Sequence, residues 1–315
     1  MLSRLRAIPH LTVSENVLLS RLTRFELGGP ASLLVDASTT DALIHAVEVI
    51  RESGTRWTLI GAGSNLVVDD SGFAGVVVRF TGSCIEIDGS CVRVEAGAGL
   101  QELVDLTIDR GLKGLETMTG IPGWVGGAIY GNAGAYGHSI DERVEWVRFF
   151  DLNTLLEIDN TACEFRYRES VFKRHKDWVV ISAVLRLTPD PPDSLKSSAD
   201  RILKIRNEKY PPALRCAGSI FKNLIFAEIP PSAQAHVPPQ LIREGKVPSA
   251  YFLEQAGAKG LKKGAIRVAD YHANLIYNEG GGTSLELRSL IDELKSRVLE
   301  RFGLLLEEEV QYVGV

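Results

Sequence analysis

Short apolar runs and amphipathic stretches alternate along the first third of the chain and predict strands and helices in turn. In the predicted helices apolar residues recur three and four positions apart, and a glycine follows the last turn. Residues 1–20 are expected to form a short leading helix or arm. The predicted strands are residues 32–36, 57–60 and 91–96, and the predicted helices run from an N-cap at Thr39 or Thr40 to Gly54 and over residues 100–110.

The pattern of the chain changes near residue 190, where the proline-rich stretch 188–194 reads as a joint. The two strands predicted just before this joint, residues 144–151 and 178–187, are expected to belong to a mostly antiparallel sheet. The last helix has a predicted capping box in Thr283 and Glu286, and Gly303 closes it. The strands predicted in this half are residues 144–151, 178–187 and 309–313, and the helices are residues 195–209 and 284–302.

The order of these elements predicts an α+β chain, and a length of 315 residues favours two or three domains. One domain is predicted over residues 1–190, with subdomains over about 1–80 and 81–190. An α/β domain is predicted over residues 191–305. Residues 306–315 are then expected to form a C-terminal strand.

One segment stands out by its composition. Residues 114–137, GLETMTGIPGWVGGAIYGNAGAYG, hold eight glycines and one proline in 24 residues. Such a density disfavours a helix or a central strand, yet Ile121, Trp124, Val125 and Ile129 give the segment apolar side chains with which to pack. Two interpretations follow. The segment is a buried loop beneath a sheet, or it is a bare backbone that a large flat ligand or a diphosphate can approach closely.

The loop GAGSN at residues 61–65 follows a predicted strand and invites a dinucleotide-binding interpretation. The Rossmann fingerprint requires a third glycine three residues further on, opening a helix toward the pyrophosphate. Leu66 stands there instead, and a short strand and a turn follow with no helical period, so the Rossmann interpretation is rejected. The loop can still bind phosphate through its N–H groups and the side chains of Ser64 and Asn65, or it can be a plain tight turn.

Composition narrows the class of protein. Apolar residues make up 45% and charged residues 24%, both ordinary for a soluble globular chain, and a net charge of −5 argues against a general nucleic-acid binder. The four cysteines form no CxxC pair and no metal-ligand spacing, so reduced thiols in a cytoplasmic protein without a metal site are expected. No apolar run is long enough to span a membrane, and no signal peptide is visible.

Arg168, in the sequence FRYRES, could carry chemistry. On a strand or at its end, Arg166 and Arg168 would share a face, and an arginine fork suits a carboxylate or a phosphate. The commoner case is a surface arginine that pairs with Glu164 or Glu169.

Ser219 and Glu309 are two further candidates. Small residues precede Ser219 in AGSIFKN and would let a ligand approach; without a GxSxG elbow a hydrolase nucleophile is not expected, and a turn or N-cap serine is the alternative. Glu309 is the last of three acids entering the terminal strand, where a solvated edge is usual. Basic residues near Ser219 would suit an anionic substrate or merely solvate a helix: Arg201, Lys204, Arg206, Lys209, Arg215 and Lys222.

Several segments taken in order carry a resemblance. They are GGPA (28–31), GAGSNLVVDDSGFAG (61–75), GIPGWVGGAIYGNAGAYG (120–137), YRESVF (167–172), AGSIFKN (217–223), HANLIYN (272–278) and LEEEVQYVG (306–314). With them the chain, from about residue 20 onward, resembles the UDP-N-acetylenolpyruvoylglucosamine reductase family in its shorter subtype. Each fragment is weak alone, whereas the ordered set is specific. The resemblance implies a two-subdomain FAD-binding fold of the vanillyl-alcohol-oxidase (PCMH) type, followed by a C-terminal α/β substrate-binding domain.

The resemblance also implies the residues of the site. Arg168, Ser219 and Glu309 would be catalytic. A second set would bind the uridine diphosphate part of the substrate or the competing NADPH: Tyr167, Lys209, Asn223 and His272. A third set would hold FAD without a covalent bond: Gly61, Ala62, Gly63, Ser64, Asn65, Gly120, Ile121, Pro122, Gly123, Gly126, Gly127, Ala128, Asn132, Ala133 and Gly134.

The implied reaction reduces UDP-N-acetylglucosamine enolpyruvate to UDP-N-acetylmuramate. NADPH would reduce FAD and leave, and the enolpyruvyl ether would then receive the hydride in the same site. Arg168 and Glu309 would stabilise the resulting enolate, and Ser219, aided by Lys222 or a water, would deliver the proton. The resemblance thereby implies a cytoplasmic, monomeric oxidoreductase of peptidoglycan synthesis, and so of cell wall biogenesis, cell shape and cell division.

The chain departs from the family pattern at a few positions. Cys216 stands where asparagine or threonine is more usual, and the loop after Asn223 is longer than expected, with two Pro-Pro pairs. The alternative enzyme is an FAD-dependent oxidase of the same fold that acts on a sugar or alcohol. A binding protein without activity is the non-enzyme alternative, and the intact arginine, serine and glutamate set argues against it.

Overall fold

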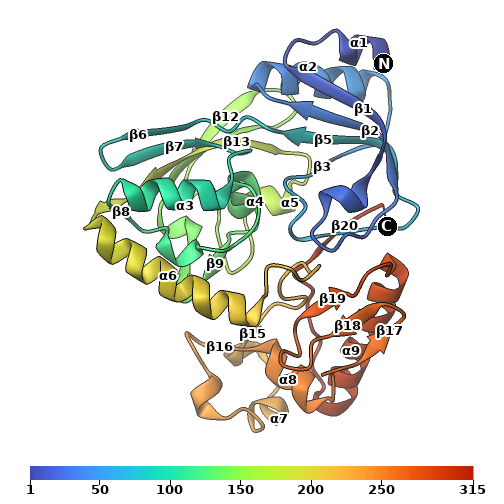
Figure 1. Cartoon of the computed structure of the whole chain (residues 1–315), viewed down its shortest axis with the longest axis vertical. Coiled ribbons are helices and arrows are strands. Elements are labelled where there is room, and N and C mark those ends of the chain that lie inside the picture. Colours follow the sequence, from blue (N-terminus) through green and yellow to red (C-terminus); the bar gives the residue numbers. More distant parts are fainter. Residues whose placement is uncertain (315) are drawn as a thin grey trace. The chain divides into compact units, whose positions relative to one another are not determined.

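The computed structural model describes residues 1–314, and the chain divides into two compact units (Figure 1). Unit 1 comprises Met1–Val17, Ala31–Gly63 and Phe73–Glu208. Unit 2 comprises Leu18–Pro30, Ser64–Gly72 and the chain from Lys209 onward. Each unit has a hydrophobic core of its own. The domain boundaries expected at 190/191 and 305/306 stay a prediction.

Two sheets dominate unit 1. Their strands are β1 (Leu11–Leu18), β2 (Pro30–Ala37), β3 (Trp57–Leu59), β5 (Phe73–Phe80), β6 (Ile85–Asp88), β7 (Cys91–Glu95), β11 (Val144–Phe150), β12 (Leu155–Asp159) and β13 (Val179–Arg186). The first sheet has the order β1-β2-β5-β3, and both β2 and β3 run parallel to β5. The second, β12-β11-β13-β7-β6, is antiparallel throughout, which confirms the predicted antiparallel sheet.

Short strand pairs and helices complete unit 1. The pairs are β8 (Leu112–Lys113) with β14 (Thr188–Pro189), and β9 (Gly134–Ala135) with β10 (His138–Ser139). The helices are α1 (Leu2–Arg6), α2 (Thr40–Glu52), α3 (Leu100–Asp109), α4 (Val125–Tyr130), α5 (Val171–Arg174) and α6 (Pro192–Lys209). In Figure 1, α2 lies over the sheet that contains β5, and α3 lies beside β8. Residues 1–20, expected as a helix or arm, include α1 and the strand β1.

The predicted ends of α2 are confirmed. The Thr39 hydroxyl accepts a hydrogen bond from the Ala42 N–H at 3.3 Å, as an N-cap side chain does. Gly54 follows the helix with φ +67°, a left-handed conformation that glycine adopts without steric cost. Ala46, Val47 and Ile50 on one face of the helix are fully buried in the core of unit 1.

The glycine-rich segment contains the short helix α4, so the expectation that it is not helical was wrong. The N–H of Gly126 donates to the Ala96 carbonyl at 2.8 Å, and that of Val125 to Ala98 at 2.9 Å. A Cβ on Gly126 would lie only 2.8 Å from the Cβ of Ala96. Glycine at 126 therefore lets the helix approach the end of β7, and this tertiary contact outweighs the low helix propensity of glycine.

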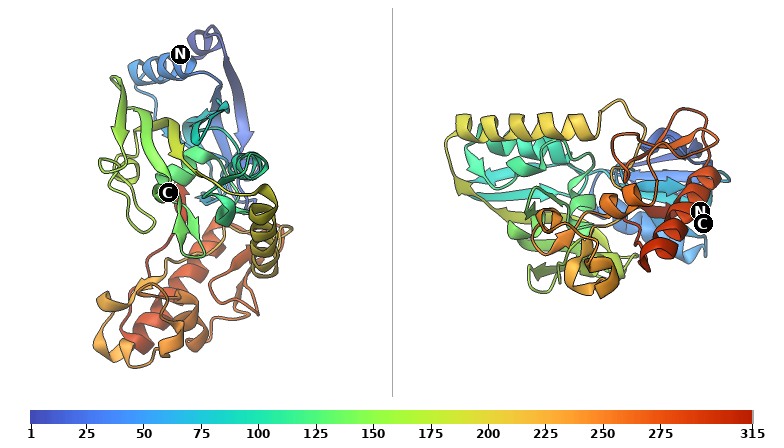
Figure 2. Two further views of the ribbon diagram at one scale, coloured as in Figure 1. Left: turned by 90° about the vertical axis from the view of Figure 1, so that its left-hand side faces the viewer. Right: turned by 90° about the horizontal axis from the view of Figure 1, so that it is seen from below.

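Unit 2 is built from short strands and one long helix. Its strands are β4 (Leu66–Val68), β15 (Leu224–Ile225), β16 (Lys246–Val247), β17 (Lys262–Lys263), β18 (Ile266–Val268), β19 (Ile276–Asn278) and β20 (Gln311–Val313), and its helices are α7 (Pro231–Gln234), α8 (Ser249–Gln255) and α9 (Ser284–Phe302). β17, β18 and β19 form an antiparallel sheet against which α9 packs (Figure 2). The capping box of Thr283 with Glu286 and the closing Gly303 of α9 are confirmed.

The C-terminal strand is shorter than predicted. β20 pairs in parallel with β4 from Gln311 to Val313, and Glu309 lies before it. Glu308 forms a bridge with Phe221, whereas Gln311 pairs with Leu66, so the chain changes its partner between these two residues. The strand predicted over 309–313 therefore starts two residues too early, because alternation of side chains does not reveal a change of partner.

Within residues 1–314 no helix is both long and apolar enough to cross a membrane. The same part of the chain contains no group of three or more His, Cys, Asp or Glu side chains arranged to hold a metal ion.

Candidate active site

Arg168 lies in a tight turn and not on a strand, so the expectation that Arg166 and Arg168 share a strand face was wrong. The N–H groups of Arg166 and Glu169 each donate to the other's carbonyl, at 3.0 and 3.1 Å, with Tyr167 and Arg168 between them. Arg168 has φ +58°, which is uncommon for a residue other than glycine. Backbone strain of this kind concentrates at functional sites.

The side chain of Arg168 reaches the glycine-rich segment inside unit 1. Its guanidinium donates to the carbonyl of Gly134 at 2.7 Å and to that of Asn132 at 3.3 Å. Asn132 is 3% exposed and donates through Nδ2 to the Arg166 carbonyl at 3.0 Å. The guanidinium also lies 5.2 Å from the centre of the Tyr167 ring. Unit 1 thus brings together two residues expected at the flavin and two expected at the substrate.

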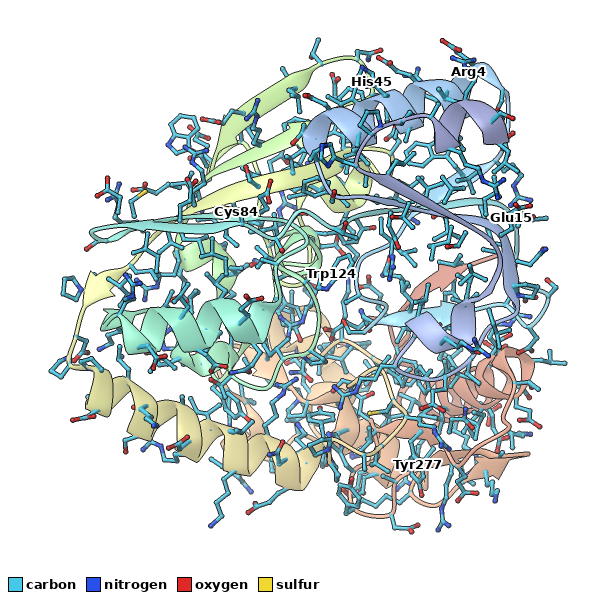
Figure 3. All side chains as sticks on the ribbon, turned by 45° about the horizontal axis from the view of Figure 1, so that its top comes forward. Arg4, Glu15, His45, Cys84, Trp124 and Tyr277 are labelled. Carbon is cyan, nitrogen blue, oxygen red and sulfur yellow. The ribbon has the colours of Figure 1, made fainter. Side chains whose placement is uncertain are left out.

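The glycine-rich segment is anchored on both sides. The Gly120 N–H donates to Oε1 of Gln101 at 2.6 Å, and its carbonyl accepts from Nε of Arg206 at 2.8 Å. Trp124, labelled in Figure 3, precedes α4 and lies 5.6 Å from the Arg79 guanidinium. The buried-loop and ligand-binding interpretations are therefore compatible, because the segment is packed and still carries bare backbone.

At two glycines of the expected flavin set, neither the backbone conformation nor a close protein contact requires glycine. Neither Gly61 nor Gly127 has a positive φ, and a Cβ built on either would meet no atom within 4 Å. Gly127 lies inside α4, where glycine costs about 0.5–1 kcal/mol relative to alanine. A Cβ at these positions would meet no protein atom, so the residues leave room for the close approach of FAD.

The loop at residues 61–65 joins β3 to β4, and no helix follows it, in agreement with the rejected Rossmann interpretation. Its first three residues belong to unit 1 and its last two to unit 2. Asn65 is fixed within unit 2: its Nδ2 donates to the Glu309 carbonyl at 2.9 Å, and its own carbonyl accepts from the Gln311 N–H at 2.9 Å.

Ser219 and Glu309 lie on neighbouring backbone segments in unit 2. The Glu309 N–H donates to the carbonyl of Ile220, the residue after Ser219, at 2.7 Å. Asn274 secures the same segment, because its Oδ1 accepts from the Phe221 N–H at 2.9 Å and its Nδ2 donates to the Phe221 carbonyl at 2.8 Å. Two of the three expected catalytic residues, 90 positions apart in sequence, are thus held side by side.

Tyr210 is a residue that the sequence did not single out. Its hydroxyl lies 2.7 Å from Oγ of Ser219 and 3.4 Å from Nε2 of His272. The ammonium group of Lys209 lies 5.3 Å from the centre of the Tyr210 ring. The available signal was Pro211, which disfavours a helical conformation at Tyr210 and so ends α6 at Lys209. That signal marks the end of a helix, but it does not indicate where the tyrosine hydroxyl points.

Lys222 and Asn223 follow Ser219. The Lys222 side chain, 8% exposed, forms an ion pair with Glu307. The expectation that Lys222 aids Ser219 stays a prediction, and the side-chain hydrogen bond seen at Ser219 is with Tyr210. Asn223 is exposed, as is Lys209.

His272 is 8% exposed. Burial lowers the pKa of this imidazole to about 3, and the nearby charges of Lys209 and Lys259 act in the same direction. The ring is therefore neutral near pH 7. Its Nδ1 accepts a hydrogen bond from the Asn274 N–H at 3.3 Å.

Comparison with protein families defines the class first. Residues 31–155 match a family described as an FAD binding domain, so the chain is a flavoprotein. Residues 210–313 match a second family, described as "UDP-N-acetylenolpyruvoylglucosamine reductase, C-terminal domain". The α+β fold class, an FAD-binding domain followed by a second domain, is thereby confirmed.

Full-length relatives narrow this class. The chain is 56% identical over 99% of its length to the UDP-N-acetylenolpyruvoylglucosamine reductase of Solibacter usitatus, covering 100% of that protein. It is 33% identical to the reductase of the same name from Bacillus subtilis, over 96% of this chain and 94% of that one. The crystal structure of the enzyme from Thermus caldophilus superposes with a TM-score of 0.76 at 27% identity, over 96% of this chain and 99% of that chain.

The chain belongs to the UDP-N-acetylenolpyruvoylglucosamine reductase family. The resemblance stated from the sequence, the assignment as an FAD-dependent oxidoreductase and the link to peptidoglycan synthesis are confirmed at this level.

Proposed function

We propose that this protein reduces UDP-N-acetylglucosamine enolpyruvate to UDP-N-acetylmuramate at the expense of NADPH. The observation that carries the proposal is the 56% identity to a reductase of that name over 99% of the chain. FAD, when bound along residues 61–65 and 120–134, supplies a carrier that accepts a hydride from one ligand and passes it to the other. The remaining steps belong to side chains of this chain.

Ser219 is the proposed proton donor. Hydride addition to the methylene carbon of the enolpyruvyl group leaves negative charge on the neighbouring carbon and its carboxylate. The Ser219 O–H bond then breaks as a C–H bond forms at that carbon. A serine hydroxyl is a weak acid, so its oxygen needs a hydrogen-bond donor at that moment, and the Tyr210 hydroxyl at 2.7 Å is placed to act as one.

Arg168 and Glu309 are the proposed stabilisers of the enolate. The Arg168 guanidinium contributes a fixed positive charge, and its two hydrogen bonds to the carbonyls of Gly134 and Asn132 pre-orient it. The backbone of Glu309 is held by Ile220 and Asn65, and its carboxyl group is the proposed hydrogen-bond partner of an enolic oxygen. Tyr167, Lys209, Asn223 and His272 are the proposed contacts to the diphosphate-bearing ligands.

Lys209 supports a first prediction. Lys209→Ala should raise KM for both NADPH and the sugar nucleotide by about tenfold and change kcat less, because a charge-assisted hydrogen bond to a phosphate acts equally before and during the reaction. Steady-state kinetics with each ligand varied in turn measures the effect. Lys204→Ala removes an exposed lysine five residues earlier in the same helix and should leave both KM values unchanged. A loss confined to kcat would contradict the assignment.

The function itself is tested by two half-reactions under anaerobic conditions. NADPH alone should bleach the yellow colour of the protein, and addition of the enolpyruvyl sugar nucleotide should restore it with release of UDP-N-acetylmuramate. Bleaching by a sugar or alcohol in place of NADPH, with colour restored only by oxygen, would favour the oxidase alternative. Ping-pong kinetics is expected, since a single site for anionic ligands binds NADPH and the sugar nucleotide in turn.

Finer features belong to the same proposal. The enzyme is proposed to act in the cytoplasm as a monomer, with products that serve cell wall biogenesis, cell shape and cell division. FAD is proposed to be bound without a covalent link, so acid precipitation should leave the flavin in the supernatant.

A further inference from the structure

The hydrogen bonds around Ser219 in unit 2 have a definite direction. A backbone N–H can only donate, so the Asn274 N–H, 3.3 Å from Nδ1 of His272, requires that Nδ1 carry no hydrogen. The hydrogen of a neutral imidazole then lies on Nε2. The low pKa of His272, caused by burial and by the charges of Lys209 and Lys259, agrees with this neutral tautomer.

The direction continues through Tyr210. Nε2–H of His272 faces the Tyr210 oxygen at 3.4 Å and donates to it. The tyrosine oxygen accepts this bond, and in the arrangement that we infer its own hydrogen is donated to Oγ of Ser219 at 2.7 Å. The hydrogen of Ser219 is left to point away from Tyr210. Each bond in such a chain polarises the next, and the effect is stronger away from bulk water.

We infer that Tyr210 is a positioning residue for proton delivery: with His272 behind it, it turns the Ser219 hydroxyl into a donor and stabilises the serine oxygen as its proton leaves. The inference rests on the proposed function, in which Ser219 gives its proton to the substrate carbon. As that C–H bond forms, the negative charge moves to the Ser219 oxygen, where the Tyr210 hydrogen bond holds it. Water then returns a proton to the serine.

Lys209 adds to the same arrangement. Its ammonium group lies 5.3 Å from the centre of the Tyr210 ring and so helps to hold the ring in place. Tyr210→Phe keeps the ring under Lys209 and removes only the oxygen. The substitution therefore separates the hydrogen bond to Ser219 from the packing and from the cation.

The test is Tyr210→Phe, measured in the two half-reactions of the flavin-loaded enzyme. Reduction of the flavin by NADPH should keep its rate, and the second half-reaction should slow about 10- to 100-fold, the worth of a hydrogen bond to a developing charge. Tyr271→Phe removes the same group from a tyrosine that is 53% exposed, next to His272, and should change neither rate.

A double variant decides whether Tyr210 acts through Ser219. In a Ser219→Ala background, Tyr210→Phe should have no further effect, because the oxygen that it serves is gone. A persisting effect, equal slowing of both half-reactions, or a Tyr210→Phe enzyme as fast as the native one would overturn the inference. If Ser219→Ala alone leaves the second half-reaction intact, the proposed proton donor is wrong and the inference falls with it. Failure of Tyr210→Phe alone leaves Ser219 standing.

Discussion

Ser219→Ala should slow the second half-reaction about 10²- to 10⁴-fold, the range that a positioned general acid contributes. Reduction by NADPH should be nearly unaffected, because no proton from Ser219 is needed when the hydride leaves the nicotinamide. Stopped-flow absorbance of the flavin follows both steps separately. A large effect is expected because the alanine variant lacks the hydroxyl that lies 2.7 Å from the Tyr210 hydroxyl and is the proposed source of the proton.

Ser219→Thr serves as the matched variant, since it keeps a hydroxyl at the same position and should retain much more of the second half-reaction than alanine does. The segment should stay folded in both variants, because Asn274 and the Glu309 N–H hold it through Phe221 and Ile220 and not through the serine side chain. Equal loss of both half-reactions in the alanine variant would rule out Ser219 as the proton donor.

The regular elements could be predicted because their signals are local. Helix α2 is set by Thr39 before it and Gly54 after it, and α9 by Thr283, Glu286 and Gly303. Alternation of apolar residues likewise sufficed for β7, and β11 and β13 were predicted from short apolar runs. Propensity, capping and periodicity agree at these places, so no long-range information is required.

The misses have tertiary causes. Helix α4 depends on the contact of Gly126 with Ala96, 30 residues away in sequence, which composition cannot show. The turn at Arg168 places a non-glycine residue at φ +58°, against its own preference, and local rules favour a strand there. Strand β20 starts at Gln311 because its partner changes from Phe221 to Leu66.

The candidate site shows the same division. Arg168, Ser219 and Glu309 came from ordered motifs, and the structure adds how each is held within its own unit. Tyr210 belongs to no motif, and its role depends on where its hydroxyl lies relative to Ser219 and His272. Ser219 and His272 lie 9 and 62 residues from Tyr210 in the sequence, so only the folded chain shows that the tyrosine hydroxyl meets both side chains.

The flavin-binding segment supports the second large effect. Gly127→Leu should weaken FAD binding by about tenfold or more, since overpacking of a fitted site costs about 1–3 kcal/mol. The apoprotein should be no less stable than the native one, because a Cβ at this position meets no protein atom within 4 Å and leucine is a better helix former than glycine. Flavin absorbance per chain and FAD titration measure the binding, and thermal melting of the apoprotein measures the stability.

Gly126→Leu is the contrasting variant at the neighbouring position. Its Cβ would lie 2.8 Å from the Cβ of Ala96, so the clash is with the protein itself, and the apoprotein should melt at a lower temperature. The two variants thus distinguish two reasons for a glycine. At position 127 a glycine leaves room for a ligand, and at position 126 it leaves room for Ala96 at the end of β7. A Gly127→Leu protein that binds FAD with native affinity would show that the flavin does not lie against this face of α4. A Gly126→Leu apoprotein of native stability would show that α4 can move away from Ala96, and the close packing inferred for the segment would then be wrong.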